Sequence, residues 1–168
     1  QSFLDELAEV MQKDPIEFRL ELLNRAKTNP VGKNNDYDPD RFAGVLKLVR
    51  EKSGWNEPKA NVHRGVSAYF CHNSYVAEVL DIVIQKNKPV VQKVVAAVDC
   101  GIVINPDAAI NMGEGAIVDG IGNAFYGEMT FKELLAEIKE DPFKRDFVQA
   151  DFTLYKLYDE KQSAHAAV

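Results

Sequence analysis

The residues best suited to binding a ligand are four glycines inside a predicted helix that follows Asp99-Cys100-Gly101. Asn105 is expected to cap this helix, with Pro106 in its first turn. Each glycine inside a helix costs about 1 kcal/mol relative to alanine, so four remove roughly 4 kcal/mol of helical propensity. Close approach of the backbone to a neighbouring element or to a bulky ligand usually compensates, because glycine has no Cβ. The four are Gly113, Gly115, Gly120 and Gly122.

Three roles can be considered for this helix: dinucleotide binding, contact with another ligand, and acid–base chemistry by Glu114. Gly113-Glu114-Gly115 is not a dinucleotide-binding fingerprint, because its third glycine would fall on Val118 and these glycines lie inside the helix rather than in the turn before it. Ligand contact by residues 112–115 competes with plain packing of the helix on a sheet, and both remain open. Glu114 is not assigned as an acid or base, since a lone glutamate on a helix is more often structural.

The cysteines and histidines predict no metal site. Cys71-His72 is a single pair without a second pair at ligand spacing. Asn73, which follows, is expected to adopt the left-handed backbone region in a turn. Cys71 and Cys100 do not make a disulfide framework, and both are expected to be buried small thiols in strand-like contexts.

The elements that must position these residues begin with three predicted helices. Ser2 and Asp5 form a capping-box pattern for the first. Asp-Pro pairs open the other two, with a polar loop over residues 32–37 between them. The second helix runs from Asp14-Pro15 to before Asn29-Pro30, and the third from Asp38-Pro39 to Gly54.

Strands follow, and the predicted fold class is α+β with N-terminal helices and a small mixed or antiparallel sheet. The strands are expected over residues 66–70, 75–85 and 90–98, the last two joined by a turn over residues 86–89. Residues 75–84 are mostly apolar on both parities and predict a central strand with both faces largely covered. The glycine-rich helix is expected to pack on this sheet, and a helical tail to follow. The predicted domains are a helical segment (1–58), a partial cofactor-binding α+β domain (59–131) and a tail (132–168).

The motifs in this chain resemble those of the molybdopterin-binding large subunit of the xanthine dehydrogenase and aldehyde oxidase family, and most closely the branch that includes the isoquinoline 1-oxidoreductase beta subunit. The family pattern is Val-Asp-Cys-Gly, Asn-Pro, a Gln-x-Glu-Gly segment and a run of glycines leading to Tyr-Gly-Glu-hydrophobic-Thr. The similar residues here are 98–101, 105–106, 112–115 and 126–130, with further similar segments at 2–8, 13–20, 45–46, 51–55, 64–68 and 74–79. The likeness covers about residues 1–131 in unbroken order, which is more specific than any single short motif.

The resemblance implies a parent protein that binds molybdopterin and oxidises an aldehyde or an N-heterocycle, a small-molecule substrate, with oxygen derived from water. Electrons would leave through a partner iron–sulfur subunit. The residues expected to contact the cofactor are Met112, Gly113, Glu114, Gly115, Asn73 and Ser74. No metal ligand is expected from the protein, because the pterin dithiolene holds the molybdenum in this family.

Two departures from the family pattern bear on activity. Met112 stands where the family usually has glutamine, and a thioether is a weak acceptor that donates nothing. The family's Gly-x-Gly-Glu segment, whose glutamate is the general base, occurs nowhere in the sequence, and the likeness stops at Lys132. A general base must lie within hydrogen-bond reach of its proton. We therefore expect the chain to be inactive and to bind no cofactor by itself, with no catalytic residue assigned.

The composition excludes some classes of protein and leaves a second function open. With 168 residues, 46% hydrophobic, and a net charge of −6, the chain is typical of a globular domain and not basic enough to suggest nucleic acid. No apolar run approaches the roughly 20 residues of a membrane span. The residues do not decide between cytoplasm and periplasm. The alternative to a fragment of a molybdenum hydroxylase is a noncatalytic α+β structural or interaction module.

Overall fold

The computed structural model describes residues 1–32 and 37–127. It forms two compact units, Gln1–Asn105 and a second that begins at Pro106. In order, the elements are α1 (Ser2–Val10), α2 (Pro15–Thr28), α3 (Pro39–Ser53), β1 (His63–Cys71), β2 (Ser74–Gln85), β3 (Lys88–Asp99) and α4 (Pro106–Tyr126). The predicted α+β class is confirmed. The predicted helical tail lies outside the described residues, and the predicted domain boundaries stay a prediction.

The two Asp-Pro pairs start helices as predicted. Asp14 accepts hydrogen bonds from the backbone N–H groups of Ile16 and Glu17, both at 2.9 Å, and Pro15 occupies the first turn. Asp38 caps α3 in the same way. At the other end of α3, Gly54 adopts the left-handed conformation (φ 63°) that glycine reaches without steric cost.

The capping box predicted at Ser2 and Asp5 is wrong. Gln1 is the N-cap, its carbonyl accepts from the N–H of Leu4 at 2.9 Å, and α1 has no side-chain cap. The carboxylate of Asp5 pairs instead with buried Arg19, at 2.8 Å. A buried guanidinium needs a charged partner more than an exposed helix end needs a cap, so the tertiary pair prevails.

The sheet is antiparallel, with the order β1-β2-β3 and β2 in the centre, as predicted. Each hairpin closes through two residues with positive φ, which is the geometry of a type I′ turn. These are His72 and Asn73 in the first turn and Lys86 and Asn87 in the second. The second turn is shorter than predicted, because Lys88 and Pro89 already belong to β3. Proline is tolerated there, near the start of an edge strand.

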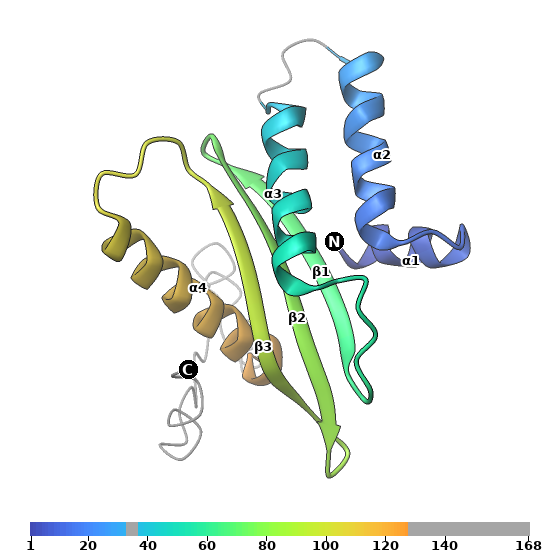
Figure 1. Ribbon diagram of the computed structural model, residues 1–168, viewed down its shortest axis with the longest axis vertical. Coiled ribbons are helices and arrows are strands. Elements are labelled where there is room, and N and C mark those ends of the chain that lie inside the picture. Colours follow the sequence, from blue (N-terminus) through green and yellow to red (C-terminus); the bar gives the residue numbers. More distant parts are fainter. Residues whose placement is uncertain (33–36, 128–168) are drawn as a thin grey trace, which may run out of the picture. The chain divides into compact units, whose positions relative to one another are not determined.

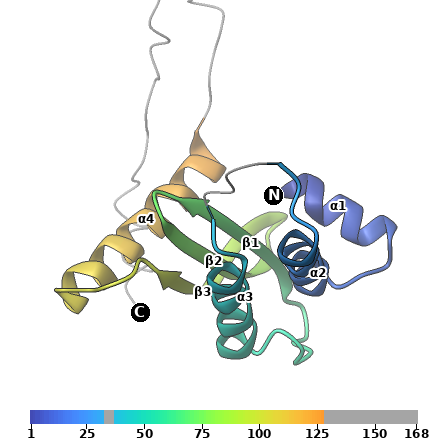
Figure 2. The same cartoon turned by 90° about the horizontal axis from the view of Figure 1, so that it is seen from above.

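The core of the first unit lies between α3 and one face of the sheet. Figure 1 shows α3 lying along the strands with α2 beside it, and Figure 2 shows the same order from above. Along β2 the residues from Tyr75 to Val83 alternate between buried and half-buried, so only one face of the central strand is fully covered. The buried residues of the core are Ile16, Val45, Leu46, Val49, Val66, Ala68, Tyr75, Ala77, Val79 and Ala97.

The glycine-rich helix exists as predicted, over Pro106–Tyr126. It belongs to the second unit. Its packing on the sheet therefore stays a prediction. Within the described residues, no helix is long and apolar enough to cross a membrane.

Candidate functional site

Asp99, the last residue of β3, organises one end of the sheet. Arg41 of α3 donates to both of its carboxylate oxygens, from Nε at 2.8 Å and from Nη2 at 2.7 Å. The backbone N–H of Gly101 donates to Oδ1 at 3.1 Å. The hydrogen bond from Arg41, followed by that from Gly101, lowers the pKa of Asp99 from 3.8 to about 2. The carboxylate is therefore ionised throughout the neutral range.

The Asp99-Cys100-Gly101 motif has a local structural explanation. Asp99 accepts from the N–H two residues later, which turns the chain immediately after the strand. Gly101 has φ 78°, in the left-handed region that L side chains rarely adopt. A Cβ on Gly101 would meet no heavy atom within 4 Å among the described residues, so conformation rather than space calls for glycine.

Tyr75 links this carboxylate to the core. It lies opposite Asp99 in the β2–β3 register, is 2% exposed, and its ring stacks on Phe70 with centroids 5.0 Å apart. The guanidinium of Arg41 lies over the same ring, 4.6 Å from its centroid. The Tyr75 hydroxyl accepts from the N–H of Asp38 at 2.6 Å. The start of α3 and the ends of β2 and β3 are thus bound together.

The sequence reasoning missed Arg41 and Tyr75. Arg41 reads as an ordinary charged residue of a helix, and it lies 58 positions from its partner. Tyr75 reads as one apolar residue among several in a strand. A single sequence carries no signal for such a pairing, because neither residue stands at a distinctive spacing from Asp99.

Two of the predicted cofactor contacts lie where β1 turns into β2, Asn73 in the turn and Ser74 as the first residue of β2. Asn73 has φ 59°, which confirms the predicted left-handed conformation. Ser74 Oγ donates to the carbonyl of His72 at 3.5 Å. Ser74 pairs with Cys71, and its neighbour Tyr75 pairs with Asp99. Asn73 and Ser74 therefore lie at the same end of the sheet as the loop of residues 100–105.

The two cysteines are exposed, and the prediction that they are buried is wrong. Cys71 is the last residue of β1, on the parity opposite to the buried Val66 and Ala68, and Cys100 lies one residue beyond β3. Cys71 Sγ is 3.0 Å from Nδ1 of His72. No group of three or more potential metal ligands occurs in the part of the chain that the structure describes.

The first three glycines of α4 have open space beside them. A Cβ built on Gly113, Gly115 or Gly120 would meet no heavy atom of the described chain within 4 Å. Gly122, in contrast, is buried. Met112 is 77% exposed. The helix backbone is therefore open at Gly113 and Gly120, which lie seven residues apart on one face, and at Gly115, which lies on another.

The six predicted cofactor contacts form two sets of neighbouring residues. Asn73 and Ser74 are adjacent in the first unit, and Met112, Gly113, Glu114 and Gly115 are adjacent in α4. The two sets belong to different units, and their convergence on one ligand stays a prediction.

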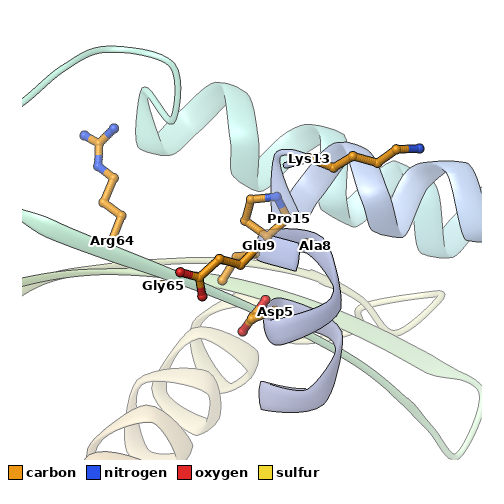
Figure 3. Close-up of a pocket in the computed structure, with 8 residues that line it drawn as sticks. Asp5, Ala8, Glu9, Lys13, Pro15, Arg64 and Gly65 are labelled. Carbon is orange, nitrogen blue, oxygen red and sulfur yellow. The ribbon is translucent and has the colours of Figure 1, made fainter. Parts of the chain in front are cut away.

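A separate pocket of about 370 Å³ lies between α1 and β1 (Figure 3). Its two cationic residues, Arg64 and Lys13, already have structural partners. Arg64 donates from Nε to buried Asp81 at 2.8 Å, Lys59 also contacts Asp81, and Lys13 pairs with Glu21. Figure 3 shows Arg64 and Lys13 pointing away from Asp5 and Glu9. The lining residues therefore do not converge on a reacting group. They are Asp5, Ala8, Glu9, Lys13, Pro15, Arg64, Gly65 and Val66.

Residues 28–139 match the sequence model of a family described as the molybdopterin cofactor-binding domain. This match covers α3, all three strands, the turn after Asp99 and the glycine-rich helix α4. The chain belongs to this family, and molybdopterin is the cofactor of the family.

Two proteins with similar sequences are larger than this chain. The isoquinoline 1-oxidoreductase subunit beta of Brevundimonas diminuta is 30% identical over 130 residues, which is 74% of this chain and 15% of that protein. A membrane-bound aldehyde dehydrogenase of Gluconacetobacter polyoxogenes, named for pyrroloquinoline quinone, is 33% identical over 144 residues, which is 74% of this chain and 17% of that protein. The chain thus spans less than a fifth of the length of these relatives.

Proposed function

We propose that this chain is a segment of the large subunit of a molybdenum hydroxylase, and that the intact subunit oxidises an aldehyde or an N-heterocycle with oxygen derived from water. The observation that carries the proposal is the family match over residues 28–139, combined with the open backbone at Gly113 and Gly115. The name of one relative refers to an N-heterocycle and that of the other to an aldehyde. An iron–sulfur subunit is the proposed electron-accepting partner.

The residues of this chain fit a role in holding the cofactor rather than in the chemical step. Molybdopterin, when bound, supplies the redox chemistry. Gly113 or Gly115, which lie on different faces of α4, would leave room for its ring system, and Asn73 and Ser74 would offer polar groups at the sheet end. Met112 presents only a thioether, which is a poor substitute for a donating amide. The absence of a Gly-x-Gly-Glu segment from the sequence supports the further proposal that this chain is inactive by itself.

The proposal is tested by filling the open space beside the glycines in the complete subunit. Gly113→Leu with Gly115→Leu should lower its molybdenum content, measured by mass spectrometry, and its pterin content, measured by fluorescence after oxidation. Ala124→Leu is the matched control, because residue 124 is an exposed position of the same helix, nine residues beyond Gly115. Equal molybdenum in both variants would contradict the proposed contact. Pyrroloquinoline quinone in place of molybdenum would overturn the proposed cofactor.

The inactivity of this chain has a separate test. The purified chain, supplied with molybdopterin, should show no detectable aldehyde oxidation, and robust turnover would refute the proposal.

Sequencing the coding DNA across Lys132 and several hundred bases beyond distinguishes a hydroxylase fragment from a noncatalytic structural or interaction module. A Gly-x-Gly-Glu segment in another frame would support the hydroxylase fragment. Its absence would favour the noncatalytic module.

A further inference from the structure

The ion pair between Arg41 and Asp99 joins α3 to the end of β3 with a fixed geometry. Both guanidinium contacts are short, at 2.7 and 2.8 Å, and they engage separate carboxylate oxygens. Each side chain is 35% exposed, so the pair lies at the edge of the core. A bidentate pair of this kind constrains orientation as well as distance.

The same carboxylate controls where the chain goes next. Its Oδ1 accepts from the N–H of Gly101, at the residue whose φ of 78° turns the backbone away from the strand. Burial of apolar side chains does not hold the following loop, because Ile102 and Ile104 are 93% and 94% exposed. The polar contacts of Asp99 are therefore the anchor at the start of this loop.

Arg41 is in turn held from the side of the core. Its guanidinium lies over the buried ring of Tyr75, whose hydroxyl accepts from the N–H of Asp38 at the cap of α3. Tyr75 and Asp99 are register partners, so the ring that Arg41 packs on comes from the strand position opposite Asp99. Arg41 has little freedom to leave Asp99 without losing the contact with the ring.

We propose that Arg41 is a positioning residue, which acts through Asp99 to fix the course of the loop over residues 100–105 that leads into the glycine-rich helix. This inference rests on the proposed role of residues 112–115 in contacting molybdopterin. The helical segment would then contribute to cofactor binding without touching the cofactor. Loss of the two hydrogen bonds from Arg41 would make local opening of the loop more frequent while the core stays folded.

The first test is made on this chain by amide hydrogen exchange. Arg41→Ala and Arg41→Lys should speed exchange of the Gly101 N–H by about two- to tenfold, as expected when a single hydrogen bond is weakened. Lysine keeps the positive charge but cannot donate two parallel hydrogen bonds to the carboxylate, so it should not restore protection. The matched control is Asp40→Ala, which breaks the exposed Lys27–Asp40 pair in the same turn of α3. An unchanged Gly101 exchange rate in Arg41→Ala would overturn the proposal.

A charge swap separates positioning from simple attraction. In Arg41→Asp with Asp99→Arg the opposite charges remain, but arginine at position 99 offers no acceptor to the Gly101 N–H. We expect Gly101 to exchange as fast in the swap as in Arg41→Ala. Restored protection would show that the ion pair alone matters and would refute the positioning role.

The second test uses the complete subunit and its molybdenum content. Arg41→Ala should lower the molybdenum content at least twofold while the unfolding midpoint of the variant stays near that of Asp40→Ala. If molybdenum falls only in proportion to unfolded protein, or does not fall, the positioning role is refuted. If the unsubstituted subunit itself lacks molybdenum, the proposed function fails instead. That outcome is therefore distinct from failure of this inference.

Discussion

Replacing the first glycines of α4 by alanine should strengthen the helix in this chain. Gly113 and Gly115 lie inside Pro106–Tyr126 without positive φ, and a Cβ at either position meets no heavy atom of the described chain within 4 Å. Alanine therefore gains helical propensity without a steric cost. Each substitution is worth about 1 kcal/mol, and the pair about 2 kcal/mol.

The assay for this prediction is amide exchange across the middle of α4. A gain of about 1 kcal/mol slows exchange roughly fivefold, and about 2 kcal/mol slows it roughly thirtyfold, if opening is local. Ala116→Gly is the matched control and should speed exchange by about fivefold, because it reverses the same change in the same helix. In the complete subunit, larger side chains at these glycines should lower the cofactor content, although they do not weaken the helix.

Faster exchange in Gly113→Ala or Gly115→Ala would refute the reasoning. Such a result would mean that another part of the chain approaches these glycines closely, since only a clash could outweigh the propensity gain. The glycines would then be explained by packing of the protein on itself. The ligand interpretation of residues 112–115 would lose its main support.

Three further predictions concern the first unit. Leu46→Ala, at a position that is 1% exposed, should lower the free energy of unfolding by about 2–5 kcal/mol in urea, whereas Leu48→Ala, 45% exposed, should change it by less than about 0.5 kcal/mol. Asp14→Ala should cost about 1–2 kcal/mol by thermal denaturation, and Asp14→Asn, which keeps an acceptor, should cost less. Burial raises the pKa of Asp81, but hydrogen bonds from its two cationic neighbours outweigh this and lower it below 3.8. Its stabilisation is therefore complete above about pH 4 and is lost as the pH falls through the lower folded-state pKa, so unfolding curves of wild type and Asp81→Asn should converge in acid.

Local chemistry made much of the first unit predictable. Asp14-Pro15 and Asp38-Pro39 specify helix starts because the cap and the proline act within one turn. Gly54 specifies a helix end, because few other residues adopt its φ of 63° at low cost. Asn73 specifies a tight turn for a related reason. These signals lie within four residues of the structure they determine, so one sequence is sufficient to read them.

The sequence by itself determined the helices, the strands, the turn at Asn73 and the membership of a molybdopterin-binding family, which the order of its motifs indicates. Tertiary structure alone decided which long-range pairs form. Arg41 meets Asp99 only because α3 packs along β2 and β3, and Asp5 pairs with Arg19, instead of completing a capping box, because Arg19 is buried beside it. Cys100 is exposed because the chain turns at Gly101 directly beyond the strand. Such contacts depend on how separate elements pack, and spacing along the chain does not encode that arrangement locally.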